Sequence, residues 1–399
     1  MDFRFSSEHE AFRQMVREFA AREIAPYIRE WDERGHFEFS VLEKMGELGI
    51  LGVCIPERWG GGGMDYISLA IAAEEIEYVE SSYREYISVH TGLTSLALLQ
   101  WGTEEQKERY LKPLARGEKF AAFGLTEPNA GSDVAGLQTV ARRHGDVYVL
   151  NGEKAWITLG DRADVVLIFA KTDPEARHEG ISAFIVEKTF PGFKGTPIKN
   201  KLGVRAGSTA RITLQDVEVP VENRLGEEGE GFKIAMSALD NGRMTVAAGA
   251  VGLIRACIDA SVRYAQQREA FGRPIGRFQL VQRMIAEMVA GYEASRWLAY
   301  HAAWLKNQGI RNTRETSLAK WFATEAAWKA ADMALQIHGA YGYSSEYPVE
   351  RFLRNSRAAV IYEGTTQIHQ LMQAEYALGY RRDAPLRREL PAWPFGEDA

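Results

Sequence analysis

The chain has 399 residues, of which 46% are hydrophobic, and 48 Lys and Arg stand against 54 Asp and Glu for a net charge of -6. This length exceeds what a single hydrophobic core usually fills, so two or three domains are expected. The two signs of charge are interleaved along the chain rather than gathered in a basic block, which argues against a nucleic acid partner.

The cysteines and the apolar runs indicate a cytoplasmic protein. Cys54 and Cys257 lie far apart and lack the spacing of a metal or redox motif, so they predict buried reduced thiols and no disulfide framework. The N-terminal segment carries acidic residues and no apolar signal core, and charges interrupt the apolar runs before the ~20 residues of a membrane span. The histidines form no HExxH or similar cluster, so no metal site is predicted.

The first part of the chain, residues 1–119, is expected to be a helical domain. Apolar residues recur every three or four positions, as in Phe12, Val16 and Phe19, which is typical of amphipathic helices. A run of four glycines, residues 60–63, follows Pro56 with no strand before it and no Lys-Ser/Thr after it. The run therefore predicts a loop rather than a phosphate-binding turn.

The residue pattern then changes to short runs of β-branched and aromatic residues separated by turn residues, which predicts a compact antiparallel β domain over residues 120–225. No helical pattern separates these strands, which argues against a dinucleotide-binding βαβ sheet. Helical periodicity returns in long stretches near residues 229–267, 278–308 and 313–337, and predicts a bundle over residues 226–384. The tail, residues 385–399, is interpreted as an irregular extension or a subunit-contacting arm.

Two polar segments of the β region are candidates for ligand binding. The loop FGLTEPNAGSD, from Phe123 to Asp133, offers hydroxyls, an amide and backbone N–H groups that could face an anion, although an ordinary polar turn is the alternative. In LNGEKAWITLG, Trp156 lies two residues from Thr158, so both are expected on one strand face. A Trp there is either core or one flank of a flat aromatic ligand.

A third segment, AVIYEGTTQIH, places Glu363 at the junction of two helical patterns beside Val360 and Ile361. Apolar neighbours raise the pKa of a carboxyl group toward the range of a general base. The alternative is a solvated Glu near a helix N-terminus.

Together these motifs resemble the acyl-CoA dehydrogenase family. LTEPNAGSD, AWIT, QREAFG with FQLVQ, QIHGAYG and YEGTTQIHQ occur in the order and spacing of that family over residues 5–379. The resemblance implies an α+β multidomain fold, with an N-terminal helical domain, a middle antiparallel β domain and a C-terminal four-helix bundle. It also implies bound FAD, an acyl-CoA substrate, a homotetramer built as a dimer of dimers, and an electron-transfer flavoprotein as electron acceptor.

The resemblance further implies roles for individual residues. Glu363 matches the base that removes the α-proton while hydride passes to flavin N5, with Trp156 against the flavin ring and Thr158 bonded to N5. Some relatives, the isovaleryl and long-chain types, carry the base at the position of Gly242, so those two specificities are disfavoured. The implied FAD ligands are Phe123, Leu125, Thr126, Gly131, Ser132, Trp156, Ile157, Thr158, Arg268, Phe271, Gln279, Gln336, Gly339, Thr365 and Gln367, those from Arg268 to Gly339 acting across a subunit interface. The implied substrate ligands are Ser132, Asp240, Arg243 and Gly364.

A short- or medium-chain acyl-CoA, converted to the trans-2-enoyl-CoA, is the expected substrate. The alternative rests on Arg84 and Ser88, which share a face with Glu77 if one continuous helix carries all three. This pattern resembles the glutaryl-CoA dehydrogenases, in which such residues contact a distal carboxylate. A surface Arg84 paired with Glu80 or Glu85 would remove that interpretation, as would a helix break near Arg84. A flavin acyl-CoA oxidase, or a flavin-binding protein with little turnover, also remains open.

Overall fold

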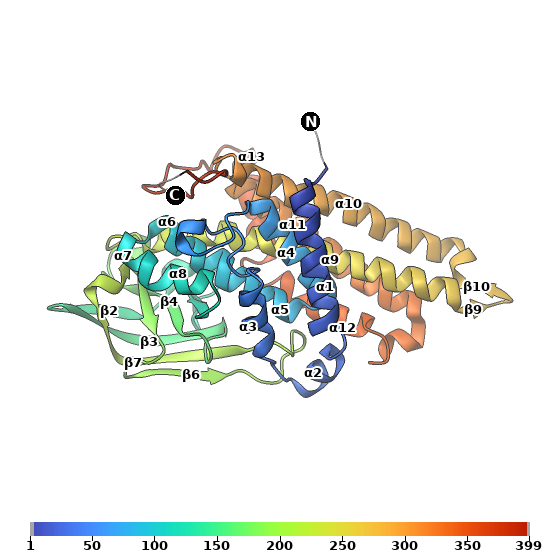
Figure 1. The fold of residues 1–399 in the computed structure, drawn as a ribbon, viewed down its shortest axis with the longest axis horizontal. Helices are drawn as coiled ribbons and strands as arrows, with labels where there is room; N and C mark the ends of the chain where they lie inside the picture. Colours follow the sequence, from blue (N-terminus) through green and yellow to red (C-terminus); the bar gives the residue numbers. More distant parts are fainter. Residues whose placement is uncertain (1–3, 397–399) are drawn as a thin grey trace.

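The computed structural model describes residues 4–396 and opens with a layer of helices packed over the sheet and the long C-terminal helices (Figure 1). Helix α1 (Ser7–Glu23) starts at Ser6, which accepts from the His9 N–H at 3.2 Å, and it buries Phe12, Val16 and Phe19 as their spacing predicts. The glycine run forms the predicted loop. The other N-terminal helices are α2 (Ile28–Arg34), α3 (Ser40–Glu47), η1 (Glu57–Trp59), α4 (Tyr66–Val79), α5 (Ser81–Tyr86), the π-helix η2 (Ile87–Ser95), α6 (Leu96–Trp101), α7 (Glu104–Gln106), η3 (Lys107–Leu111) and α8 (Lys112–Ala115).

The helical stretch that carries Glu77 and Arg84 is interrupted at Glu80. Its backbone is extended, with φ -159° and ψ 123°, so α4 ends there and α5 begins on the next residue. The side chain of Glu80 accepts from the backbone N–H of Ser82 at 3.1 Å and caps the new helix. The continuous helix from Glu77 to Ser88 on which the shared face depends is therefore not formed, because the helix restarts at this capping interaction.

The middle region forms one sheet in the order β6-β7-β3-β2-β4-β5-β8, with β1 joined to β4. Most pairs are antiparallel, but β1 runs parallel to β4, and β2 makes one parallel contact with β4. The sheet is mixed rather than purely antiparallel because β1 and the start of β2 follow one another along β4 in the same direction, with most of the FGLTEPNAGSD loop between them. Its strands are β1 (Ala121–Gly124), β2 (Val140–His144), β3 (Val147–Thr158), β4 (Val165–Lys171), β5 (Ile181–Glu187), β6 (Phe193–Pro197), β7 (Thr209–Pro220) and β8 (Arg224–Leu225).

Three long helices dominate the C-terminal part and lie close to their predicted ranges: α9 (Gly231–Gln267), α10 (Gln279–Asn307) and α11 (Thr313–His338). Helix α9 is long and apolar enough to cross a membrane by composition, but 72% of that apolar window is buried within the protein, where it packs as the central core helix. Two shorter helices, α12 (Val349–Ala359) and α13 (Thr366–Ala377), complete this region.

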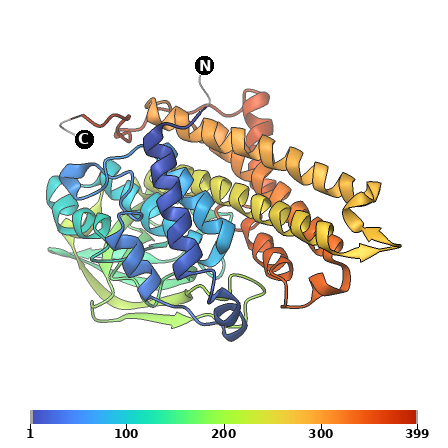
Figure 2. The same cartoon turned by 45° about the vertical axis from the view of Figure 1, so that its right-hand side comes forward.

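A small hairpin of β9 (Glu269–Ala270) and β10 (Arg273–Pro274) projects from the end of α9 and α10 (Figure 2). The described part of the tail is irregular, as predicted, and packs against the N-terminal helical part of the same chain. The Tyr66 hydroxyl donates to the Pro391 carbonyl at 2.8 Å, and Trp393 Nε1 donates to the Gly63 carbonyl at 3.1 Å. Both cysteines, Cys54 and Cys257, are buried and free, which confirms the predicted thiols.

Candidate active site

Glu363 lies in the turn that joins α12 to α13. The turn is left-handed, with φ +53° at Glu363 and +102° at Gly364, and α13 starts immediately afterwards, capped by Thr365. The Glu363 Oε2 atom is buried without a hydrogen-bond partner among the residues that the structure describes. A non-glycine residue in this backbone region, carrying an unsatisfied buried oxygen, is typical of a functional position.

Burial raises the pKa of Glu363 to about 7, against the opposing positive charges of Arg84, Lys320 and Arg243. This confirms the raised pKa that the apolar neighbours predict. A carboxyl group that titrates near neutrality is suited to accept a proton in a reaction at physiological pH.

Gly242 on α9 lies directly beneath the carboxyl group of Glu363. A β-carbon at position 242 would stand 2.2 Å from Glu363 Oε2 and 2.6 Å from the Cδ2 of Leu93. A side chain at position 242 and the present position of the Glu363 carboxylate therefore exclude each other. The glycine gives the space in which the carboxyl group sits.

Two cations hold the backbone on either side of the reactive turn. Arg243 Nε donates to the Glu363 carbonyl at 3.0 Å, and Lys320 Nζ donates to the Gly364 carbonyl at 2.7 Å. His369 packs under the same turn, because a β-carbon on Gly364 would lie 2.9 Å from its Nε2. Helices α9, α11 and α13 thus all position this one loop.

Arg84 is buried beside this loop rather than on the surface, with only 1% of its side chain exposed. Its guanidinium donates to the Glu77 carboxylate and to the Tyr362 hydroxyl, and Nη1 donates to Ser88 Oγ at 2.9 Å. Burial disfavours the charged guanidinium, but Glu77, Tyr362 and Glu85 together outweigh this effect, and the pKa of Arg84 is raised. The surface interpretation with Glu80 or Glu85 is wrong, and Glu77, Arg84 and Ser88 meet despite the helix break.

The loop after β1 is fixed to β3 by a buried ion pair. Lys154 Nζ donates to Glu127 Oε1 at 2.7 Å and to the Leu125 carbonyl at 3.2 Å, and Ala155 N–H donates to the Thr126 carbonyl at 2.9 Å. The structure therefore brings the predicted loop next to the AWIT segment. In this loop Phe123 and Leu125 are buried, Thr126 is half-buried, and Gly131 and Ser132 are exposed.

A bulge in β3 sets the direction of Trp156. The pairing with β7 steps from Lys154 opposite Ile212 to Ile157 opposite Ala210, so β3 carries one extra residue. Trp156 has φ +61° and is 63% exposed, whereas Ile157 is buried and Thr158 half-buried. Bulges of this kind turn a side chain out of the ladder, often beside active sites. A large exposed Trp on a sheet excludes the core alternative and leaves a free aromatic face.

The remaining predicted flavin residues lie elsewhere. Arg268 and Phe271 belong to the hairpin at the end of α9, where Arg268 stacks over the Tyr341 ring at 5.5 Å and Phe271 is 95% exposed. Gln279 starts α10, and Gln336 and Gly339 end α11, all of them exposed. The hairpin and the sheet lie at opposite ends of the molecule (Figure 1). One chain therefore does not bring both groups of predicted FAD ligands together.

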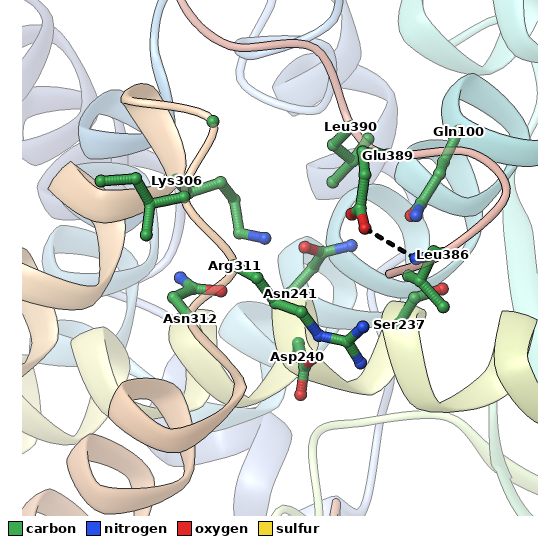
Figure 3. A pocket seen from close by; sticks show the side chains of 12 residues that line it. Gln100, Ser237, Asp240, Asn241, Lys306, Arg311, Asn312, Leu386, Glu389 and Leu390 are labelled. Atoms are coloured by element: carbon green, nitrogen blue, oxygen red, sulfur yellow. Dashed lines mark hydrogen bonds between the residues drawn. The ribbon is translucent and has the colours of Figure 1, made fainter. Parts of the chain in front are cut away.

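Asp240 lies one helical turn from Arg243 and lines a pocket to which the C-terminal tail contributes Leu386, Glu389 and Leu390 (Figure 3). Its Oδ2 accepts from the Thr313 hydroxyl at 2.6 Å, and its Oδ1 is 3.6 Å from Arg243 Nη1. Burial raises the pKa of Asp240. Arg311 and Glu389, the latter from the tail, face the same pocket.

Sequence reasoning missed Lys320, Tyr362 and His369 as neighbours of the base. Tyr362 and His369 belong to the same YEGTTQIH motif as Glu363 and could have been named as site residues on that ground. Lys320 had a detectable signal, because it falls in the stripe of buried small residues along α11 that includes Ala323 and Ala327. Among residues 4–396, no group of three or more His, Cys, Asp or Glu could hold a metal ion.

Comparison with known proteins decides the family. The descriptions "Acyl-CoA dehydrogenase, N-terminal domain", "middle domain" and "C-terminal domain" match residues 6–118, 122–217 and 229–378. The chain belongs to the acyl-CoA dehydrogenase family. Its expected fold class, with helical, β and helical parts, is confirmed by solved members of the family.

Several relatives match over almost their whole length. The short-chain specific acyl-CoA dehydrogenase of Clostridium acetobutylicum is 44% identical over 372 residues, which are 93% of this chain and 98% of that protein. The butyryl-CoA dehydrogenase structure from Megasphaera elsdenii is 40% identical with a TM-score of 0.93, covering 95% of this chain and 100% of the other. A glutaryl-CoA dehydrogenase in complex with glutaryl-CoA is 41% identical with a TM-score of 0.93, covering 96% and 98%.

Proposed function

We propose that this enzyme is an FAD-dependent acyl-CoA dehydrogenase that converts a short- or medium-chain acyl-CoA to the trans-2-enoyl-CoA with Glu363 as the base. The observation that carries the proposal is the Glu363 carboxyl group, whose Oε2 atom is buried without a hydrogen-bond partner among the described residues and whose pKa is raised by burial to about 7. Short-chain relatives that match 93% of this chain support the substrate class.

The residues present fit FAD. An acyl-CoA dehydrogenase of the same fold is complexed with FAD. The exposed Trp156 offers an aromatic face on a bulged strand, and the neighbouring loop is fixed by the Lys154–Glu127 pair. We infer that Phe123, Leu125, Thr126, Gly131, Ser132, Ile157, Thr158, Thr365 and Gln367 complete this side of the cofactor site. When bound, FAD supplies the oxidant that takes up the hydride of the β-carbon.

The chain's own residues perform the proton step. The bond between the α-carbon and its hydrogen breaks, the proton passes to the Glu363 carboxylate, and the electron pair stays on the substrate. A thioester α-proton is a very weak acid, so hydrogen-bond donors at the thioester carbonyl must stabilise the charge that develops there. The backbone N–H of Glu363, in its left-handed turn, is one proposed donor. We place Gly364, Arg243, Asp240 and Ser132 along the rest of the acyl-CoA.

The contacts of Arg84 bear on the choice between a monoacyl and a dicarboxyl substrate. Arg84 donates to the Tyr362 hydroxyl next to Glu363, which favours glutaryl-CoA as a second candidate. However, its charge is already balanced by Glu77, and Ser88 takes a further N–H. An arginine that is satisfied within the protein needs no substrate carboxylate, so the monoacyl substrate is preferred.

Anaerobic bleaching of the bound flavin tests the function and the substrate together. Butyryl-, octanoyl-, isobutyryl- and glutaryl-CoA are added separately to the FAD-loaded protein, and the loss of visible absorbance is followed. Bleaching by butyryl- or octanoyl-CoA is expected. Bleaching by glutaryl-CoA alone would replace the monoacyl substrate with the dicarboxyl one, and no bleaching by any of the four would contradict the proposed function.

The exposed hairpin supports a homotetramer built as a dimer of dimers. Phe271 is 95% exposed on a projecting turn, and Tyr343, which follows α11, is 87% exposed, so both rings are available to a partner surface. A neighbouring copy would bring Arg268, Gln279, Gln336 and Gly339 to the FAD bound by the first copy. Light scattering should give four chains, and Phe271→Asp should lower both the assembly state and the FAD content. A wild-type monomer with full FAD would contradict this arrangement.

We also propose an electron-transfer flavoprotein as the electron acceptor, with the enzyme in the cytoplasm. The dehydrogenase assignment predicts that the reduced, product-bound enzyme reacts slowly with oxygen and rapidly with such a flavoprotein. Rapid reoxidation by oxygen would instead make the protein an acyl-CoA oxidase.

A further inference from the structure

Lys320 is a buried lysine that the proposed reaction does not yet use. Its side chain is 0% exposed on α11, on the face lined by Ala323 and Ala327. Among the described residues it forms no ion pair with a carboxylate, and its Nζ donates instead to the Gly364 carbonyl at 2.7 Å. Burying an ammonium group without a paired carboxylate is costly, so a position of this kind calls for a function.

Lys320 is one of two cations that donate hydrogen bonds to the backbone of the catalytic turn. Arg243 Nε holds the Glu363 carbonyl at 3.0 Å from α9, and Lys320 holds the next carbonyl from α11. The turn between them has positive φ at both Glu363 and Gly364. Such a backbone conformation persists only when surrounding contacts hold it in place. Here the hydrogen bonds from Arg243 and Lys320 to two successive carbonyls hold it.

We propose that Lys320 is a positioning residue for proton abstraction, which fixes the Glu363 turn through the Gly364 carbonyl and favours the ionised carboxylate of Glu363 by its positive charge. This inference rests on the proposed function, since it gives Lys320 a role in that reaction. Lys320 does not take up the substrate proton, which goes to Glu363. It acts through the base.

The charges around the turn come from several elements. Burial raises the pKa of Glu363 to about 7, Arg84, Lys320 and Arg243 oppose the rise, and Glu85 adds to it. Burial lowers the pKa of Lys320 to about 7, with Glu363 opposing. The other charged or titratable groups that face the pair are Arg84 and Glu85 from α5, Arg243 from α9, Glu325 from α11, Tyr362 from the turn, and His369 from α13, whose pKa burial lowers to about 2.

The two arginines stay charged throughout, and the charge of Arg84 is balanced by Glu77. Lys320 is thus the neighbour whose replacement removes a positive charge from the base without leaving a carboxylate ion pair broken. Without that charge, the ionised form of Glu363 loses a favourable interaction, and ionisation moves to higher pH.

The test compares Lys320→Met, Lys320→Gln and Lys320→Arg in the FAD-loaded protein. Lys320→Gln keeps an N–H donor but no charge, and it also tests the charge if Lys320→Met fails to fold. Lys329→Met, on an exposed position of the same helix, is the matched control. The rate of anaerobic flavin reduction by butyryl-CoA is measured between about pH 6 and pH 9.

Both neutral variants should move the midpoint of the pH profile upward by about one unit, with the rate falling roughly tenfold below the midpoint and less above it. Lys320→Arg and Lys329→Met should keep the wild-type midpoint. As a readout without turnover, the infrared C=O band assigned by Glu363→Gln should persist to higher pH in the neutral variants. The FAD content should stay at the wild-type level.

An equal loss of rate at every pH, with an unmoved infrared titration, would make Lys320 only structural and overturn the proposal, as would unchanged rates. These outcomes differ from failure of the proposed function, in which the wild-type protein itself would not be bleached by any acyl-CoA.

Discussion

Adding one methyl group at Gly242 should displace the catalytic base while leaving the fold intact. In Gly242→Ala the new β-carbon would stand 2.2 Å from Glu363 Oε2, whereas ordinary contacts begin at 3.4 Å, so the carboxylate oxygen must move by more than 1 Å. The obstructing atoms, Glu363 Oε2 and Leu93 Cδ2, are the ends of flexible side chains, so the protein can relax at small cost. A 1 Å misplacement of a reacting group costs on the order of 100-fold in rate, or about 2.7 kcal/mol.

The assay is single-turnover flavin reduction by butyryl-CoA under anaerobic conditions, with the FAD content and melting temperature measured in parallel. Gly92→Ala is the matched control, because its β-carbon would lie at an ordinary 3.5 Å from the Cα of Gly242. Gly242→Ala should lose about 100-fold in rate while Gly92→Ala stays close to wild type. A Gly242→Ala enzyme that reduces its flavin at the wild-type rate would refute the placement of the Glu363 carboxylate.

Three further predictions concern the buried charges. Arg84→Met leaves the Glu77 carboxylate buried and unpaired, so the free energy of unfolding should fall by about 3 kcal/mol in denaturant titrations, and adding Glu77→Gln should recover part of it. Lys154→Met likewise leaves the Glu127 carboxylate buried and unpaired beneath the β1 loop. The free energy of unfolding should fall by about 3 kcal/mol in the same titrations, and FAD should be retained less well on gel filtration. A variant with wild-type stability would contradict the role of this ion pair. In the wild type, Glu363 is protonated below its pKa of about 7, so the rate of flavin reduction should fall about tenfold per pH unit below that value and level off above it. A profile that is flat down to about pH 5 would contradict this titration.

The order of the elements could be predicted from the sequence because periodicity is a local property. Helices α9, α10 and α11 begin and end within two residues of the predicted stretches, and the junction before α13 was expected from the YEGTT motif. The parallel pairing of β1 with β4 could not be predicted, because the partner of a strand depends on contacts between distant segments.

The candidate site was predicted in its residue types and in part of its geometry. Glu363 carries the raised pKa that its apolar neighbours indicate. The break at Glu80 was missed because a helix restart depends on one capping contact. Glu77 was expected on the same helix face as Arg84, but not as its ion-pair partner. An ion pair formed across a helix break does not follow from the spacing of residues in the sequence. Lys320 falls on the buried face of α11, but its place beside Glu363 was missed because its carbonyl partner, Gly364, lies 44 residues away along the chain.

The central claim is that the Glu363 carboxylate removes the α-proton of an acyl-CoA. Its most direct test is anaerobic flavin reduction by butyryl-CoA in Glu363→Gln, at a pH above 7 where the wild-type carboxyl group is ionised. The variant should keep the visible spectrum of bound FAD and bind the substrate, while the reduction rate falls by roughly 100-fold to 10,000-fold, as for loss of a general base. Reduction of the flavin at a rate close to wild type would contradict the account.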